Sequence, residues 1–167
     1  MNWDIKEIHN YNEYMQKYSI HSLLAKIFAL REYNEQDVQG HTSKRLIYHD
    51  FSLFLDADLV LDRIQEALEN DEKICIYGDY DCDGILSTVI LVQAFLELGK
   101  KVGYHIPNRF EDGYGLNKER VQQMYEKGYS LLITVDNGIK AYEAIDLANE
   151  LGIDVIVIDH HDYDELP

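Results

Sequence analysis

Three aspartates at alternating positions, Asp79, Asp81 and Asp83, are the residues of this sequence best suited to chemistry. Carboxylates held this close together repel one another unless a cation neutralises them, so their spacing predicts a site for a divalent metal ion. The apolar run 73–77 before them is typical of a buried strand, and the longer run 85–96 after them is typical of a buried helix. The aspartates are therefore expected in a strand-to-helix turn that directs their side chains to a common point.

The aspartate stretch by itself is compatible with other kinds of site. The three aspartates and Gly84 match the first half of an EF-hand calcium loop, but Ile90 stands where that loop needs a bidentate glutamate, which excludes the EF-hand. Residues 81–85, Asp-Cys-Asp-Gly-Ile, also resemble the aspartyl nucleophile motif of haloacid-dehalogenase-like phosphatases, and this stretch alone leaves that alternative open. The glycine patterns of Rossmann and P-loop nucleotide sites are absent.

Two more groups of polar residues follow apolar runs later in the chain. Asp136 comes directly after the run 131–135, and an Asp-His-His triplet at 159–161 comes directly after the run 154–158. Ligands of open α/β sheets bind outside the carboxyl ends of the strands, so these groups are expected beside Asp79 and its neighbours. Carboxylates together with an imidazole suit Mn²⁺, Mg²⁺ or Zn²⁺, and the donors suffice for two cations.

The bulk properties of the chain describe one globular protein of about domain size. It has 167 residues, of which 46% are hydrophobic and 28% charged, and no apolar run approaches the roughly 18 residues of a membrane span. Two cysteines do not make a disulfide framework, which indicates a reducing, cytoplasmic setting. The net charge of −16 argues against a large nucleic-acid-binding groove within these residues, but not against a site for phosphoryl transfer.

The elements that must position these groups change in type partway along the chain. Residues 1–70 are predicted to form a helical segment, including a helix that Asp56 caps and whose Leu59 faces inward. From 71 to 167 strands alternate with helices, which predicts an α/β fold with a parallel sheet and helices on both faces. Besides the runs already given, a strand is expected over 101–107 and helices over 117–127 and 141–151.

Residues 79–84, 135–138 and 159–161 resemble, in that order, the first three motifs of the DHH phosphoesterase superfamily. Within it, the segment 106–117, which reads Ile-Pro-Asn-Arg-Phe-Glu-Asp-Gly-Tyr-Gly-Leu-Asn, is similar to one typical of the RecJ family of single-strand-specific 5′→3′ exonucleases. Tyr77 also stands where family II pyrophosphatases have a histidine, which favours RecJ. The resemblance implies the DHH phosphoesterase fold and metal-dependent hydrolysis of phosphodiester bonds in single-stranded DNA, for DNA repair and recombination.

The resemblance also carries metal-binding roles over to residues of this chain. The implied ligands are five carboxylates and one imidazole, namely Asp79, Asp81, Asp83, Asp136, Asp159 and His160. Asp136 is placed to bridge two Mn²⁺ or Mg²⁺ ions, which would assist the in-line attack of water on the phosphorus. For Asp79 and Asp159 a supporting role is also open, such as the orientation of an imidazole by Asp159.

Three further residues are implied in substrate binding. His161 resembles the family's phosphate-contacting histidine and is assigned a catalytic role together with Asp136. Asn108 and Arg109 are expected to hold a phosphate, Arg109 in a bidentate manner, although a structural turn after Pro107 explains them as well.

Proteins of the RecJ family are several times longer than this chain, so the resemblance implies that residues 71–167 are the first part of a DHH catalytic domain. A further metal-binding aspartate and the DNA-binding domains would lie beyond Pro167, and the chain by itself is expected to be inactive. The implied partners of the full-length protein are single-stranded DNA, a single-strand-binding protein and a helicase.

Two alternative functions are retained at this point. One is an oligonucleotide or cyclic-dinucleotide phosphodiesterase of the same superfamily, which the segment 108–115 weighs against. The other is a non-catalytic replication scaffold related to RecJ, which the intact aspartates and histidines weigh against. The haloacid-dehalogenase alternative ranks last because it leaves the triplet at 159–161 unexplained.

Overall fold

The computed structural model describes residues 7–43, 48–108 and 115–167 of the chain. The chain forms two compact units, Met1–Leu53 and Phe54–Pro167. The division into a segment 1–70 and a domain 71–167 stays a prediction. Among the described residues, no helix has both the length and the apolar character needed to span a membrane.

The first unit consists of short helices: α1 (Tyr11–Tyr18), α2 (Ser22–Leu30), α3 (Glu35–Thr42) and the 3₁₀ turn η1 (Phe51–Leu53). Its core is small and includes Phe28 of α2, whose ring centroid lies 5.4 Å from that of Tyr33 and 5.8 Å from that of His41. A capping box between Asn34 and Asp37 begins α3, because each side chain accepts a hydrogen bond from the other residue's backbone. This unit confirms the predicted helical N-terminal segment.

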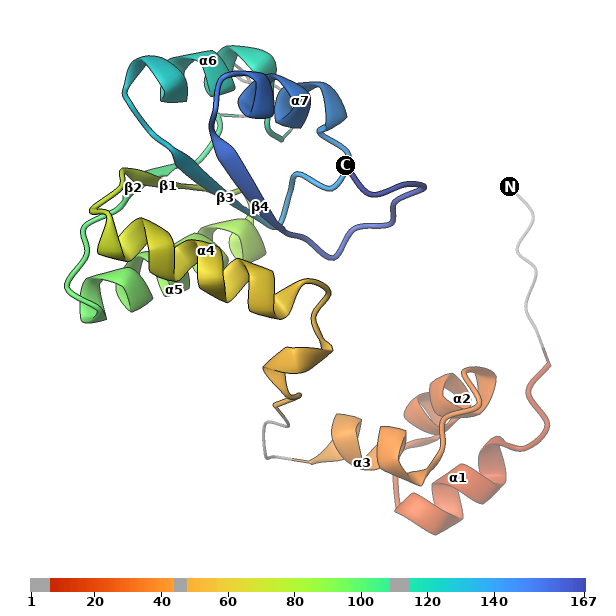
Figure 1. Cartoon of the computed structure of the whole chain (residues 1–167). Helices are drawn as coiled ribbons and strands as arrows, with labels where there is room; N and C mark the ends of the chain where they lie inside the picture. Colours follow the sequence, from red (N-terminus) through yellow and green to blue (C-terminus); the bar gives the residue numbers. More distant parts are fainter. Residues whose placement is uncertain (1–6, 44–47, 109–114) are drawn as a thin grey trace. The chain divides into compact units, whose positions relative to one another are not determined.

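The second unit is built on a four-stranded parallel sheet (Figure 1). Its strands are β1 (Ile74–Tyr77), β2 (Gly103–His105), β3 (Leu131–Val135) and β4 (Asp154–Ile158), and its helices are α4 (Ala57–Glu69), α5 (Cys82–Glu97), α6 (Lys118–Glu126) and α7 (Tyr142–Glu150). The strand order is β2-β1-β3-β4, so β1 and β3 lie next to each other at the centre. The predicted parallel sheet is confirmed, although the strand expected over 101–107 is only three residues long.

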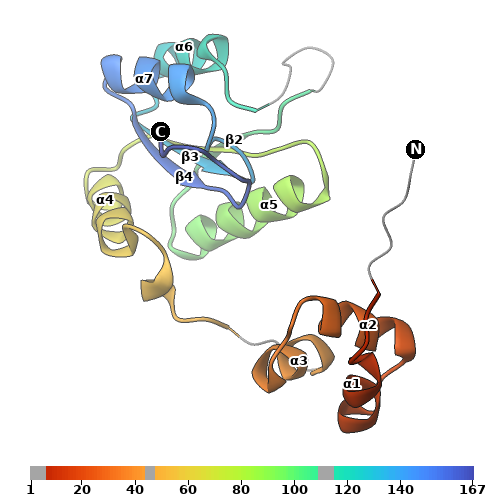
Figure 2. The same cartoon turned by 90° about the vertical axis from the view of Figure 1, so that its right-hand side faces the viewer.

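Helices cover both faces of the sheet, as Figures 1 and 2 show: α4 and α5 lie on one face, α6 and α7 on the other. Alternate residues of β1 point to opposite faces, as the pleat of a strand requires. Ile74 and Ile76 belong to a core cluster with Phe95 of α5, whereas Cys75 belongs to the opposite cluster with Met124 of α6. All five side chains are buried, and full burial of one such apolar side chain contributes about 1.5–3 kcal/mol.

Two helices differ from the prediction in the residues that they bury. Asp56 occupies the N-cap position of α4, but it has a left-handed conformation (φ 56°) and its side chain makes no capping hydrogen bond. The prediction that Leu59 faces inward is wrong, because it is 68% exposed, and Ala67 lies on the buried face instead. The helix after the aspartates is not buried all round, because Leu86 and Ile90 are 61% and 65% exposed. An apolar run predicts a helix that buries a face, but packing decides which residues turn inward.

Candidate metal centre

The turn between β1 and α5 carries the first acidic group. Asp79 follows the strand closely and is 1% exposed, so the fold encloses its carboxylate. Asp81 caps α5, because its Oδ1 accepts a hydrogen bond from the Gly84 N–H at 3.2 Å. Glycine is required at position 84, where a Cβ would lie 2.6 Å from the Cβ of Asp79. Asp83 lies in the first turn of α5, which confirms the predicted strand-to-helix turn.

Asp136 follows β3 in an unusual backbone conformation. Its φ of 62° is left-handed, which costs a residue other than glycine on the order of 1–3 kcal/mol. Its N–H donates to the Ile158 carbonyl of β4 at 2.9 Å, which keeps the residue joined to the sheet. Gly138 follows with a φ of 110°, and a Cβ there would lie 2.5 Å from Thr134 Oγ1. This tight loop leaves Asp136 only 7% exposed, at the carboxyl edge of the sheet.

Asp159 organises the end of β4 through a single carboxylate. Its Oδ2 accepts from the Ile139 N–H at 3.0 Å, and its Oδ1 accepts from the N–H groups of His160 and His161 at 2.8 and 3.2 Å. Oδ1 also lies 2.6 Å from Nδ1 of His161. Burial acts to raise the pKa of Asp159, but the hydrogen bonds outweigh it and hold this pKa below its usual value. The hydrogen bond to Asp159 in turn raises the pKa of His161.

The three groups meet at Asp136. Its Oδ1 lies 2.9 Å from Nε2 of His160, which is also 3.9 Å from Oδ2 of Asp83. Two sets of possible ligand atoms each lie within 4.8 Å of one another: one from Asp79, Asp81 and Asp136, the other from Asp136, His160 and His161. Asp136 belongs to both sets, as a bridging carboxylate must. The structure therefore brings the predicted side chains together, while their roles as ligands stay predictions.

The electrostatics of this centre suit a cation. Burial raises the pKa of Asp136, and the charges of Asp83 and Asp81 raise it further, while the hydrogen bond to His160 partly offsets both. Asp79 Oδ1 is buried and has no hydrogen-bond partner among the described residues. A buried oxygen in that state costs roughly 1–3 kcal/mol. A divalent cation would satisfy this oxygen and relieve the repulsion among the carboxylates, so the donor set fits one.

The residues predicted to hold a phosphate upstream of α6 are only partly described. Asn108 is exposed, at the end of the described range 48–108. Arg109 lies outside the described residues, so its role stays a prediction. Cys82 is an exposed free thiol at the start of α5.

Asn137 has no predicted role, yet its side chain is 3% exposed and lies between the ends of β1 and β3. Its Nδ2 donates to the carbonyl oxygens of Val135 at 2.9 Å and Tyr77 at 3.2 Å. An Asn-Gly pair after a strand is typical of an ordinary turn, which conceals this role. The signal that points to it is a polar residue directly after a candidate metal-ligating aspartate at a buried strand end.

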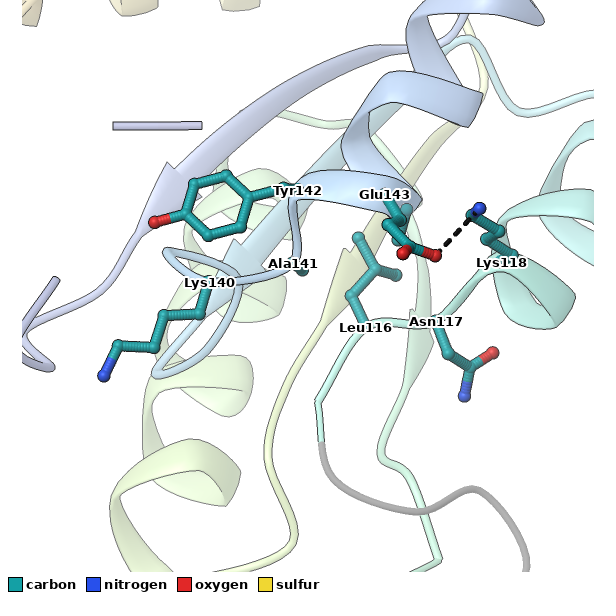
Figure 3. Close-up of a pocket in the computed structure, with 8 residues that line it drawn as sticks. Leu116, Asn117, Lys118, Lys140, Ala141, Tyr142 and Glu143 are labelled. Carbon is teal, nitrogen blue, oxygen red and sulfur yellow. Dashed lines mark ion pairs between the residues drawn. The ribbon is translucent and has the colours of Figure 1, made fainter. Parts of the chain in front are cut away.

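A cavity of about 400 Å³ lies between the N-terminal ends of α6 and α7 (Figure 3). Lys118 pairs with Glu143 at 2.8 Å on its wall, and the side chain of Lys140 extends away from this pair. Its lining includes none of the residues of the two ligand sets. The cavity is therefore separate from the candidate metal centre.

Known proteins share the sequence that forms this centre. The family model described as "DHH family, N-terminal domain" matches residues 73–167. The chain belongs to the DHH family. The matched range begins just before β1 and includes all three acidic groups, so the centre described above lies within the matched domain.

Curated relatives of this DHH protein include exonucleases named RecJ. The chain is 48% identical over 101 residues to the single-stranded-DNA-specific exonuclease RecJ of Bacillus subtilis (strain 168), across 60% of this chain and 13% of that protein. It is 38% identical over 144 residues to the protein of the same name from Dickeya dadantii (strain 3937), across 86% of this chain and 25% of that protein. The chain therefore spans 25% or less of the length of these relatives.

Solved RecJ structures have the fold of this DHH protein. The crystal structure of exonuclease RecJ bound to manganese matches with a TM-score of 0.59 and 40% identity, over 64% of this chain and 27% of that one. The crystal structure of RecJ from Thermus thermophilus in complex with Mn²⁺ matches with a TM-score of 0.64 and 26% identity, over 99% of this chain and 23% of that one. Both are manganese complexes of longer proteins.

Proposed function

We propose that this chain is the metal-binding part of a RecJ-type exonuclease, which hydrolyses phosphodiester bonds of single-stranded DNA in the 5′→3′ direction. The observation that carries the proposal is the meeting of two sets of ligand atoms at Asp136. The relatives named RecJ, at 48% and 38% identity, support it. The cofactors are two divalent cations, Mn²⁺ or Mg²⁺, which carboxylates and an imidazole suit.

The two ligand sets divide the work of holding the cations. Asp79 and Asp81 serve one ion, His160 serves the other, and Asp136 belongs to both sets and keeps the ions together. Bound cations would neutralise the phosphate and lower the pKa of the attacking water. Asp159 already accepts four hydrogen bonds from protein groups, so of its two open roles we assign it the orienting one.

His161 is the residue that we assign to the scissile phosphate. Its pKa is raised by the hydrogen bond to Asp159, so the ring is more readily protonated and its free nitrogen can donate to a phosphate oxygen. The ring also stacks on that of His160 at 4.7 Å, which limits its orientation. Asn108 and Arg109 would hold a neighbouring phosphate of the strand.

The proposed setting is DNA repair and recombination in the cytoplasm, with a single-strand-binding protein and a helicase as partners of the full-length protein. The intact ligand sets weigh against a non-catalytic scaffold. Relatives named as exonucleases specific for single-stranded DNA weigh against an oligonucleotide or cyclic-dinucleotide phosphodiesterase.

The test is the degradation of single-stranded DNA by the full-length protein under saturating Mn²⁺. Asp136→Ala is expected to reduce turnover by about 100-fold or more, because a change near a metal ligand already costs about 10–100-fold and Asp136 serves both ions. Asp146→Ala, on the exposed surface of α7, is the matched control and is expected to retain activity. Unchanged turnover in Asp136→Ala would overturn the proposal.

A further inference from the structure

Asn137 joins the ends of the two central strands. Its Nδ2 donates to the carbonyl oxygen of Val135, the last residue of β3, at 2.9 Å and to that of Tyr77, the last residue of β1, at 3.2 Å. One amide group therefore uses both of its hydrogens on carbonyls of neighbouring strands. The reverse orientation of the amide would place its oxygen against two other oxygens, so the donor must face them.

The bond to Tyr77 lies where the ladder between the central strands stops. The last paired residues of β1 and β3 are Tyr77 and Thr134. Beyond them the Gly78 N–H donates to the His105 carbonyl of β2, and the Asp136 N–H donates to the Ile158 carbonyl of β4. The segment after each central strand therefore bonds to the outer strand beside it. The Asn137 amide thus bridges β1 and β3 at the point where these strands separate into the two acidic loops.

The same amide restrains Asp136, whose neighbours on both sides it connects. Asp136 has a left-handed φ of 62°, and its carboxylate belongs to both ligand sets. A residue in such a conformation keeps it only when its surroundings hold it there. The bond from Asn137 to Val135 spans Asp136, and the bond to Tyr77 ties this closed turn to β1.

We infer that Asn137 is a positioning residue of the metal centre. Its amide holds Asp136 in the left-handed conformation and sets the separation between Asp136 and the turn that carries Asp79 and Asp81. The inference rests on the proposed function, in that the ligand sets bind metal. Loss of the amide donor should therefore weaken metal binding.

The test is Mn²⁺ binding by the purified chain, measured by titration calorimetry at a temperature where every variant is folded. Asn137→Asp keeps the shape of the side chain but turns an oxygen toward two carbonyls. It is expected to weaken Mn²⁺ binding about 10–100-fold, as loss of a group that orients a ligand does. The added negative charge alone would have the opposite effect. Asn149→Asp, on the exposed surface of α7, adds the same charge and is expected to leave binding unchanged.

A further control separates positioning from general loss of stability. Phe95→Leu, in the core cluster under α5, is expected to lower the melting temperature and keep the Mn²⁺ affinity. The electron paramagnetic resonance spectrum of bound Mn²⁺ is expected to change in Asn137→Asp and to stay the same in Phe95→Leu. If Asn137→Asp does not fold, Asn137→Ser, which lacks the amide without adding charge, carries the same expectation.

The outcomes distinguish the inference from the function on which it rests. Normal Mn²⁺ binding by the wild-type chain together with equally tight binding by the Asn137 variant would overturn the inference alone. No Mn²⁺ binding by the wild-type chain would overturn the metal centre of the proposed function and the inference with it. Weaker Mn²⁺ binding by the Asn137 variant, with the Mn²⁺ affinity unchanged in both controls, supports the inference.

Discussion

At the scale of single residues, the Asp159 carboxylate holds several neighbouring groups in place at the acidic edge of the sheet. Its two oxygens accept from the Ile139 N–H, from the N–H groups of His160 and His161, and from the His161 ring. A carboxylate bonded to one ring nitrogen of a histidine fixes the tautomer and leaves the other nitrogen for a ligand or substrate. Protonation of the Asp159–His161 pair is therefore expected to affect the stability of the folded chain.

The metal-free chain is expected to lose stability as the pH rises through the pKa of His161. The hydrogen bond to Asp159 raises this pKa in the folded chain above the usual value of about 6.5. The stabilisation is therefore fully present below about pH 6.5 and is lost as the pH rises through the higher folded-state pKa. Melting temperatures in EDTA between about pH 5.5 and 8.5 check this. His161→Gln should flatten this part of the profile, and an identical profile in the variant would contradict the assignment.

At the scale of elements, Arg63 of α4 connects this helix to the amino ends of the strands, at the end of the sheet opposite the acidic centre. Arg63 meets Glu72 at 2.7 Å and Asp154 at 2.6 Å. Glu72 lies just before β1 and also accepts from the Ser130 hydroxyl, which lies just before β3, while Asp154 begins β4. The network therefore holds the amino ends of three strands to the helix, away from the acidic centre.

Arg63→Ala is expected to lower the free energy of unfolding by about 1–3 kcal/mol, because Glu72 loses its charged donor. Lys118→Ala, which removes an exposed ion pair with Glu143, should cost less than Arg63→Ala, because solvent screens that pair. Arg63 lowers the pKa of Glu72, so this stabilisation is present above the unfolded pKa of about 4.3 and is lost as the pH falls through the lower folded pKa. Urea unfolding at neutral and acidic pH measures both effects. An equal cost of Arg63→Ala at both pH values would count against the role of Glu72.

Helix α5 presents one apolar face to the sheet and another to solvent. Phe95→Ala is expected to cost about 3–5 kcal/mol, since this side chain is 4% exposed in the core. Leu86→Gln combined with Ile90→Gln should change the unfolding free energy by about 1 kcal/mol at most, because both side chains are mostly exposed. Chemical denaturation compares the two. If the double variant is as unstable as Phe95→Ala, the exposed face contributes to the core after all.

At the scale of the whole molecule, charge and length limit what the chain does by itself. Its net charge of −16 repels a polyanion such as DNA. The chain also covers only 13% and 25% of the length of two relatives named RecJ, so most of each relative's polypeptide has no counterpart in this chain. Metal binding and nuclease activity should therefore separate in this chain.

The chain alone is expected to bind Mn²⁺ and gain stability from it, with little or no nuclease activity. A ligand at 100 times its Kd stabilises by about 2.7 kcal/mol, which raises the melting temperature of a chain of this size by about 5–10 °C. Differential scanning fluorimetry with Mn²⁺, and with EDTA as the control, measures this shift. A melting temperature that is insensitive to Mn²⁺ would contradict the metal centre. Processive digestion of single-stranded DNA that EDTA abolishes would contradict the expected inactivity.

The sequence by itself determined the strands, the sheet type and the edge at which the acidic groups lie. Short apolar runs such as 131–135 favour buried strands, and their alternation with helices favours a parallel sheet. The carboxyl ends of such strands share one edge, so the meeting of Asp81, Asp136 and His160 was predictable.

The tertiary structure decided the strand order, the left-handed turn at Asp136 and the direction of single side chains. The order β2-β1-β3-β4 brings Asn137 to the carbonyl of Tyr77, 60 residues earlier, and no local pattern encodes that contact. Packing likewise left Leu59 exposed and committed the Asp159 carboxylate to neighbouring donors. The physical reason is common to all of these. A buried or strained group is held by partners on neighbouring strands, and those partners come within reach only after the sheet has formed.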